Sequence, residues 1–261
     1  MDALRTAASG MAAQQTRVDV IANNIANMST TAYAARSAVF ADLIYRQDVN
    51  PGAISSTQGT IVPTGVQLGL GVQTQAVSMD MRQGALRQTT NDLDIAIEGN
   101  GFFEITLPNG EPAFSRDGKF EVDPDGLMVN SDGFALADGI TIPREARQVT
   151  ISADGEVFAF FDDAVEGQSI GTITLTSFVN PKGLEAMGGN LYRETTASGT
   201  PINGQPGQDG LGLLRQGYLE ESGVDVVSEI ADLIEAQRGY ELNSKVLTAA
   251  DEMYASATRI R

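Results

Sequence analysis

The amino-acid sequence predicts an α+β protein, in which a helix at each end of the chain flanks an antiparallel β region. Three observations indicate this fold class. Apolar residues recur every seven positions near both termini, and nine Asp-Gly or Asn-Gly dipeptides punctuate the middle of the chain. The middle also holds most of the net charge of −17, which is typical of a solvent-exposed region.

The N-terminal helix is expected from about Ala3 to Asn27, within a first segment of residues 1–33. Two interleaved series with a spacing of seven mark one face of it: Leu4, Met11, Val18 and Ile25, and Ala7, Gln14, Ile21 and Met28. A period of about 3.5 residues is that of a coiled-coil seam. Small residues such as Ala8 and Ala12 would let a second helix approach closely.

The C-terminal helix is expected within residues 221–261, where the spacing of seven returns. Its series is Val226, Leu233, Tyr240, Leu247 and Tyr254, and Ala236, Ala250 and Ala257 lie three residues after members of that series. Ser222 and Asp225 fit a capping box just before the helix. One stripe alone is explained by a core-facing helix of an ordinary domain, whereas stripes at both chain ends favour a pair of terminal helices.

The middle of the chain divides into three parts. Residues 81–180 alternate short apolar runs with Asp-Gly and Asn-Gly dipeptides, whose glycines suit the positive φ of tight hairpin turns, so an antiparallel β domain is expected there. Residues 181–220 are rich in glycine with little periodicity, and we expect an irregular return connection. Residues 34–80 are expected to form a connecting segment, with an insertion at 46–75 whose hydrophobic residues indicate that it lies extended against something.

Composition excludes several classes of function. The 261 residues include no Cys, His or Trp, which excludes disulfides, thiol catalysis, zinc clusters and a Ser-His-Asp arrangement. No basic patch offsets the 34 acidic residues, so neither a nucleic acid nor an anionic membrane surface is an expected partner. Residues 123–134 depart from a calcium-binding loop at its glycine and final glutamate positions. We therefore expect no catalytic residues, no metal ligands and no cofactor.

The sequence shows neither a transmembrane segment nor a secretory signal. No apolar run is long enough to form a transmembrane helix, and the N-terminus lacks the apolar region of a secretory signal. These observations indicate either the cytoplasm or export by a route that cleaves no signal.

Residues 24–33, NIANMSTTAY, resemble the signature of the flagellar rod and hook family. The matching residues are Asn24, Ile25, Ala26, Asn27, Thr30, Ala32 and Tyr33. DLDIAIEGNGFFEI and FSRDGKFEVDPDGLMVNSDGF resemble the family's central β domain, and EIADLIEAQRGYELNSKVLTAADEM resembles its C-terminal helix. FADLIYRQDVNPG with PTGVQLGLGV resembles the insertion of the distal-rod members.

Two positions depart from the family pattern. Ala32 stands where glycine is more usual, so a positive φ is not expected there, and Gly223 stands where asparagine often precedes the last helix. The asparagines Asn23, Asn24 and Asn27 are expected to bond backbone groups that are freed where the first helix ends.

The resemblance implies a structural protein and not an enzyme. The chain would be a distal-rod subunit, of which many copies assemble helically into a hollow, rigid driveshaft that transmits torque across the periplasm. The terminal helices would pair as a coiled-coil-like inner domain, with the antiparallel β domain outside it. The subunit-packing residues would then be Leu4, Met11, Val18, Ile21, Ile25, Val226, Ile230, Leu233, Tyr240, Leu247 and Tyr254.

The same resemblance implies partners besides further copies of the chain. These are the proximal rod and hook proteins, the surrounding outer-membrane and peptidoglycan ring proteins, and the flagellar type III export apparatus, which cleaves no signal. The insertion would stiffen the rod by lying across a neighbouring subunit, through Pro51, Ile54, Ile61, Val62 and Pro63. Two alternatives are a proximal rod or hook subunit, against which the insertion argues, and a carboxylate-dependent cell-wall hydrolase.

Overall fold

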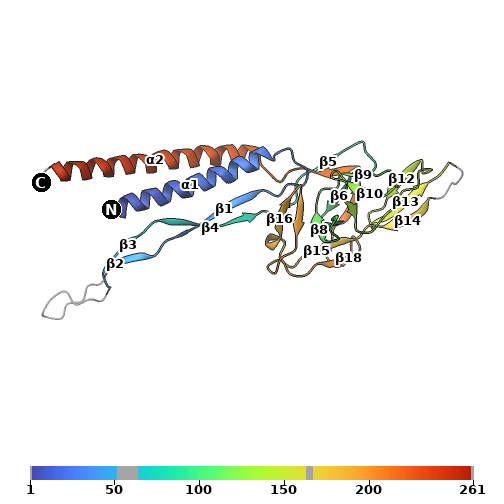
Figure 1. Ribbon diagram of the computed structural model, residues 1–261, viewed down its shortest axis with the longest axis horizontal. Coiled ribbons are helices and arrows are strands. Elements are labelled where there is room, and N and C mark those ends of the chain that lie inside the picture. Colours follow the sequence, from blue (N-terminus) through green and yellow to red (C-terminus); the bar gives the residue numbers. More distant parts are fainter. Residues whose placement is uncertain (1, 52–63, 163–166, 260–261) are drawn as a thin grey trace. The chain divides into compact units, whose positions relative to one another are not determined.

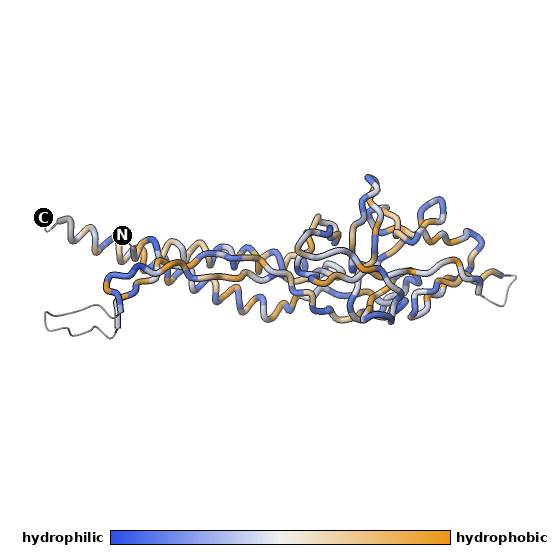
Figure 2. Tube along the Cα trace, turned by 90° about the horizontal axis from the view of Figure 1, so that it is seen from below, coloured by the Kyte–Doolittle hydropathy of each residue, from blue (hydrophilic) through white to orange (hydrophobic). Residues whose placement is uncertain are grey.

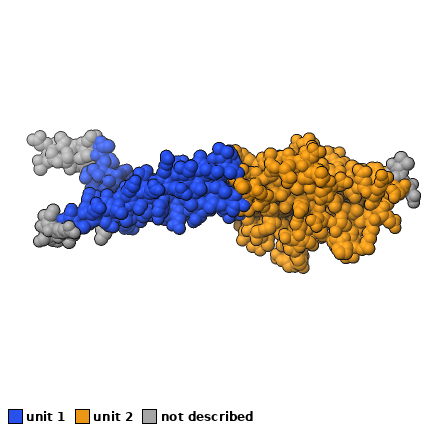
Figure 3. Space-filling model, turned by 90° about the horizontal axis from the view of Figure 1, so that it is seen from above, with its two compact units in different colours: residues 1–26, 36–79, 225–261 blue, residues 27–35, 80–224 orange. Residues whose placement is uncertain are grey.

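The computed structural model describes residues 2–51, 64–162 and 167–259. These residues form two compact units (Figure 3). The first contains residues 1–26, 36–79 and 225–261, and the second contains residues 27–35 and 80–224. Both helices belong to the first unit, so the two ends of the chain fold together as the sequence predicts.

The first unit combines two helices with a β ribbon. Helix α1 spans Asp2–Ala26 and helix α2 spans Val226–Arg259, and the two lie side by side (Figure 1). Strand β1 (Arg36–Asp42) pairs antiparallel with β4 (Val72–Met79), and both strands pack on α1. The ribbon continues with β2 (Tyr45–Val49) and β3 (Val66–Gly69).

Over residues 34–80 we expected a connecting segment with an extended insertion, and the described part of this segment forms the β ribbon. Strands β2, β3 and β4 contain several polar residues, and no strand of the ribbon carries a long apolar run. Strands β1 and β4 pack on α1, so residues that are distant in the sequence supply the surface that supports the ribbon. The sequence did not predict the strand pairing in the described part of this region.

The second unit is built on a seven-stranded antiparallel sheet with the order β16-β17-β8-β7-β11-β10-β9. In that order the strands are Glu185–Gly188, Leu191–Arg193, Pro112–Ser115, Phe103–Thr106, Ala135–Leu136, Met128–Asn130 and Phe120–Val122. A three-stranded sheet joins β12 (Gln148–Ile151), β13 (Glu156–Phe160) and β14 (Gln168–Thr172). The expected antiparallel β region is present.

Three short strand pairs complete this unit. They are β15 (Leu175–Ser177) with β18 (Ile202–Gly204), β19 (Leu213–Gln216) with β6 (Ile95–Glu98), and β20 (Tyr218–Glu220) with β5 (Leu86–Gln88). A short 3-10 helix, η1, spans Pro181–Gly183. Phe103 and Phe120 meet edge to face in the core, with ring centroids 5.2 Å apart.

Residues 181–220 belong to this β structure and are not an irregular return connection. Five strands, β16 to β20, come from them, and β16 and β17 extend the seven-stranded sheet through the pairing of β17 with β8. These strands are three or four residues long and separated by glycine-containing turns. Such short strands carry too few alternations to produce a periodic pattern. The boundary that we placed at residue 180 was therefore wrong.

The Asp-Gly and Asn-Gly dipeptides build one recurrent loop. In residues 107–111, 123–127, 130–134 and 152–156, the carbonyl of the first residue accepts a hydrogen bond from the amide of the fourth. That fourth residue is always a glycine with a φ between 82° and 90°. A type I turn followed by such a residue forms a three-residue hairpin loop. Gly118 differs, since a Cβ there would lie 1.6 Å from the Ile95 carbonyl oxygen.

A buried ion pair closes the second unit. Arg116 and Glu220 have side chains only 11% and 6% exposed, and a guanidinium nitrogen lies 3.0 Å from the carboxylate. Arg116 also donates to the carbonyls of Gly99 and Gly101, and the other oxygen of Glu220 accepts from the amide of Gly84. Each charge therefore has several partners, as buried charges require.

Replacing Arg116 by methionine should destabilise the second unit by about 3–5 kcal/mol, because Glu220 would stay buried without its counter-charge. The matched control is Arg193→Met, whose pair with Glu185 is 46% and 55% exposed, so its loss should lower the stability much less. Calorimetry and denaturant unfolding measure both changes. Equal losses for the two variants would contradict the structural role of this pair.

Candidate assembly interface

Helices α1 and α2 run antiparallel, and their facing residues identify the register. Gly10 faces Asn243, Gln14 faces Gly239, Arg17 pairs with Asp232, and Asn24 bonds Glu229. The partner on α2 moves toward its N-terminus as the position on α1 moves toward its C-terminus.

Two of these contacts place an amide side chain against a glycine of the opposite helix. A Cβ on Gly10 would lie 2.9 Å from Nδ2 of Asn243, and a Cβ on Gly239 would lie 3.2 Å from Cδ of Gln14. Neither glycine has a positive φ, so both serve close approach and not an unusual backbone. Glycine costs roughly 1 kcal/mol in a helix interior relative to alanine. Here it makes room for the side chain of the partner helix.

The buried apolar residues of the two helices are mostly small. Ala7, Ala13, Ala236 and Ala250 are buried, and Ile21 is the large apolar residue of α1 that is buried with them. The other residues that we expected to pack are partly buried in this unit: Leu4, Met11, Val18, Ile25, Val226, Leu233 and Leu247. Ile230, Tyr240 and Tyr254 are 47%, 44% and 46% exposed. Large apolar side chains of α2 are therefore more exposed than its alanines.

Asn24 joins three elements through its side-chain amide. Its Oδ1 accepts from the amide of Arg36 at 2.9 Å, and its Nδ2 donates to the Arg36 carbonyl at 2.8 Å and to Glu229 at 2.9 Å. The residue is 1% exposed. Asn24 was expected to bond backbone groups near the end of α1. It bonds the backbone of Arg36, the first residue of β1, and also the carboxylate of Glu229 on α2.

A small hollow of about 270 Å³ lies beside the hydrogen bonds of Asn24, since their partners Arg36 and Glu229 line it. Arg17, Arg36, Glu229 and Asp232 contribute charged groups to its lining. Burial raises the pKa of Glu229, whereas the hydrogen bond from Asn24 opposes that shift. Arg17 bonds Asp232 at 2.9 Å, so the polar groups of both helices meet at this level.

The signature continues in the second unit as a compact loop. The hydroxyl of Thr30 donates to the side chain of Asn27 at 3.2 Å, and the amide of Tyr33 donates to the Thr30 carbonyl. The amide of Ala32 donates to the carbonyl of Glu220 at 2.9 Å. These bonds hold the loop against the residues that precede α2.

Ala32 has a φ of +54°, so our expectation that no positive φ is required there was wrong. A left-handed conformation costs an L-residue about 1–2 kcal/mol. The hydrogen bond to Glu220 and the burial of the Ala32 methyl group hold it in place. Gly223, in contrast, has no positive φ, and a Cβ there would meet its nearest atom at 3.4 Å.

The N-terminus of α2 is capped by Asp225 and not by the expected box that begins at Ser222. The carboxylate of Asp225 accepts from the amide of Val227 at 3.1 Å and from the hydroxyl of Ser228 at 2.7 Å. The Ser228 hydroxyl is the main reason that the pKa of Asp225 is lowered. The hydroxyl of Ser222 is buried without a hydrogen-bond partner. Both Ser222 and Asp225 are residue types that cap the N-terminus of a helix. Asp225 is the cap because the helix begins directly after it, at Val226.

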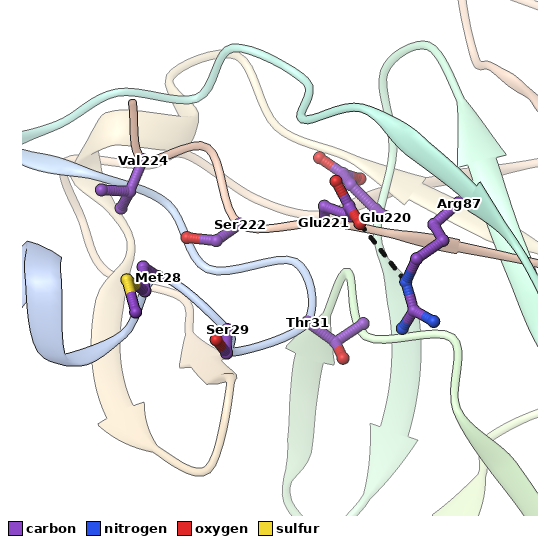
Figure 4. A pocket seen from close by; sticks show the side chains of 8 residues that line it. All are labelled: Met28, Ser29, Thr31, Arg87, Glu220, Glu221, Ser222 and Val224. Carbon is purple, nitrogen blue, oxygen red and sulfur yellow. Dashed lines mark ion pairs between the residues drawn. The ribbon is translucent and has the colours of Figure 1, made fainter. Parts of the chain in front are cut away.

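A hollow of about 360 Å³ adjoins the signature loop (Figure 4). Met28, Ser29, Thr31 and Ser222 contribute to its lining, together with Arg87 and Glu221, which pair at 3.3 Å. Glu220 also lines it but is held by Arg116. Each charged group of the lining is thus paired with an opposite charge, which suits a structural role better than acid–base catalysis.

Within residues 2–51, 64–162 and 167–259, no group of three or more His, Cys, Asp or Glu side chains is arranged to hold a metal ion. No helix formed by these residues combines the length and the hydrophobicity that crossing a bilayer demands.

Comparisons with known proteins agree with the geometry. Family models match residues 4–33 (Flagella basal body rod protein), 96–159 (Flagellar hook protein FlgE/F/G D1 domain) and 215–260 (Flagellar basal body rod FlgEFG protein C-terminal). The flagellar basal-body rod protein FlgG of Caulobacter vibrioides is 48% identical over 261 residues, which is 100% of both chains. The chain belongs to the flagellar basal-body rod protein FlgG family.

Two other FlgG proteins extend the similarity. That of Agrobacterium fabrum is 46% identical over 97% of both chains, and that of Borreliella burgdorferi is 43% identical over 100% of this chain and 99% of its own. The protein is accordingly a structural subunit of the distal rod in the flagellar basal body, and not an enzyme. Membership of the FlgG family implies self-assembly and contact with other basal-body components.

Sequence reasoning missed several residues of the helix pair. Gly10, Arg36, Glu229 and Asn243 were not among the expected packing residues, although each contacts the opposite helix or the signature asparagine. A signal was available in the isolated glycines of the two helices, because a glycine inside a helical pattern often marks a close contact.

Replacing Asn24 by aspartate should destabilise the first unit by about 2–3 kcal/mol, since the Arg36 carbonyl would lose its donor and a second carboxylate would face Glu229. The loss should shrink as the pH falls, because protonating one carboxyl group removes the repulsion. The control is Asn23→Asp, the same charge change at the neighbouring exposed position. Amide exchange of Arg36 at several pH values measures the effect, and a pH-independent loss would contradict it.

Ala32→Gly and Ala34→Gly should change stability differently. Both add backbone freedom to the unfolded chain, but only Ala32 has a positive φ, so only its substitution relieves strain. We expect the first variant to be more stable than the second by about 1–2 kcal/mol. Denaturant unfolding of both variants gives this difference, and equal stabilities would show that Ala32 carries no strain.

Proposed function

We propose that copies of this chain assemble helically into a hollow, rigid shaft that transmits torque across the periplasm, with the α1–α2 pair as its coiled-coil-like inner domain. The observation that supports this proposal is the apolar surface of α2. Val227, Leu242 and Met253 are 78%, 62% and 66% exposed, and Ile230, Ile234 and Val246 are also exposed. Figure 2 colours hydrophobic positions along the helices. Other copies of the chain would cover this surface.

The exposed fractions of the side chains divide the expected packing residues into three groups. Ile21 is buried within the chain, so its contribution to assembly would be indirect. Ile230, Tyr240 and Tyr254 are about half exposed and would contact neighbouring subunits directly. The partly buried Leu4, Met11, Val18, Ile25, Val226, Leu233 and Leu247 would support both kinds of contact.

The β2–β3 hairpin would stiffen the shaft. Every residue of both strands is exposed, including Tyr45, Val66 and Leu68. An isolated two-stranded hairpin is marginally stable in water, so a neighbouring subunit would hold it. Pro51 lies in an exposed turn after β2, whereas the other expected insertion residues, Ile54, Ile61, Val62 and Pro63, lie outside the described residues.

The further partners follow from family membership. We propose contacts with the proximal rod and hook proteins and with the surrounding outer-membrane and peptidoglycan ring proteins. Export would use the flagellar type III apparatus without a cleaved signal. No observation on the structure favours a proximal rod subunit, a hook subunit or a cell-wall hydrolase over a distal-rod subunit.

Val227→Asp should abolish filament formation while leaving the fold of the single chain intact. An acidic residue in the first turn of a helix interacts favourably with the helix dipole, and Val227 is 78% exposed. Ile21→Asp is the contrasting variant, since a carboxylate at a position that is 5% exposed should unfold the first unit instead. Electron micrographs of concentrated protein and circular dichroism of dilute protein measure the two effects. Wild-type protein that forms no filaments, or Val227→Asp filaments like those of the wild type, would contradict the proposal.

A further inference from the structure

Strand β6 of the second unit pairs with β19 along one edge, and a side chain occupies its other edge. The Nε2 of Gln83 donates to the carbonyl of Ile97 at 2.7 Å, and its Oε1 accepts from the amide of Gly99 at 3.0 Å. Two residues before Ile97, the amide of Ile95 donates to the carbonyl of Gly118 at 2.9 Å. Alternate residues of an antiparallel strand direct their backbone groups to the same edge, so all three bonds lie on the edge that β19 leaves free.

Strand β12 shows the same arrangement, because β13 covers one of its edges and the side-chain amide of Gln216 bonds the other. The Nε2 of Gln216 donates to the carbonyl of Val149 at 2.8 Å, and its Oε1 accepts from the amide of Ile151 at 3.0 Å. Each glutamine thus bonds the carbonyl of one residue and the amide two residues later. One residue of a parallel strand would bond the same two groups, since an amide side chain carries the donor and the acceptor of a backbone.

The outermost strands of the two larger sheets are irregular or short. The pairing register skips Ile170 in β14 and Met187 in β16, so each of these residues is the extra residue of a β-bulge. Strand β9, at the other end of the seven-stranded sheet, has three residues. Bulges and very short strands both hinder the pairing of a sheet edge with another chain. The two glutamines and the irregular outer strands therefore act in the same direction.

We propose that Gln83 and Gln216 are edge-blocking residues, which keep β6 and β12 from pairing with a strand of a second copy of this chain. Free backbone groups on a strand edge are a template for such pairing, and repeated pairing produces β aggregates. Membership of the FlgG family implies self-assembly, so copies of the chain come close together. Blocked edges remove strand addition between second units from the contacts that these copies can make.

Gln83→Met of the full chain is the direct test, because methionine is as long as glutamine but cannot bond Ile97 or Gly99. Gln83 is exposed, so the variant should fold. We expect the amide of Gly99 to exchange faster, and β aggregates to form about tenfold faster than in the wild type at equal concentration. Gln216→Met should act in the same way through the amide of Ile151. Thioflavin T fluorescence, infrared spectroscopy and hydrogen exchange measure these effects.

Two control variants separate edge blocking from a general effect of the substitution. Gln205→Met makes the same change at an exposed residue whose side chain bonds that of Gln208, at 3.1 Å, instead of a strand edge. It should aggregate like the wild type. Gln83→Lys removes the acceptor for the amide of Gly99 but places a charge on the edge, and charged side chains hinder strand addition. In this variant Gly99 should exchange faster without faster aggregation.

Aggregation of Gln83→Met at the wild-type rate, or unchanged exchange of Gly99 in that variant, would overturn the edge-blocking role. Aggregation of Gln83→Lys or Gln205→Met as fast as that of Gln83→Met would overturn it too, because lost stability or added hydrophobicity would then explain the effect. Gln83→Met decides the question even if circular dichroism shows that the half-buried Gln216 is required for folding.

Discussion

The amide of Asn24 is the interaction on which the first unit depends. It satisfies both backbone groups of Arg36 and reaches Glu229, so one buried side chain ties together α1, β1 and α2. An amide can do this because it carries an acceptor and two donors on one rigid group. An aspartate lacks the donors and a leucine lacks all of the hydrogen-bonding groups, so the position accepts little else. The strand begins where it does because Arg36 is already bonded to the end of the helix.

In the same unit, the buried apolar residues of the helices are mostly alanines, whereas several large apolar side chains of α2 are exposed. Alanines and glycine–amide contacts hold the helices together, which places larger side chains such as Ile230 and Tyr240 on the flanks. If large apolar residues filled the contact between α1 and α2, that surface would be buried within one chain, and less apolar surface would remain for other copies to cover. Polar contacts within the pair specify its register, whereas apolar side chains outside it are available for association. This division fits a subunit whose helices serve both its own fold and a polymer.

The second unit reaches its stability by different means. Recurrent glycine loops connect very short strands, and aromatic rings fill the space between them. The buried pair of Arg116 and Glu220 bonds backbone groups of Gly84, Gly99 and Gly101, which belong to two loops. The signature loop contacts strand β20, because the amide of Ala32 donates a hydrogen bond to the carbonyl of Glu220. Ala32 is also the residue of this loop with a positive φ. Local strain there is held by surrounding contacts, as is usual for a left-handed alanine.

Local patterns in the sequence alone determined the two terminal helices, most strands of the middle and the loops that contain Asp-Gly or Asn-Gly. These elements follow from nearest-neighbour chemistry: periodicity, turn residues and the order of the signature. Only the tertiary structure decided the pairing of residues 36–49 with 66–79, the inclusion of 185–220 in the β unit, the cap at Asp225 and the φ of Ala32. Each of these depends on a partner far away in the chain, such as α1 for the ribbon or Glu220 for Ala32. The heptad spacing identified helices that pack, but the glycines and amides, which carry no hydrophobic signal, decided which residues meet.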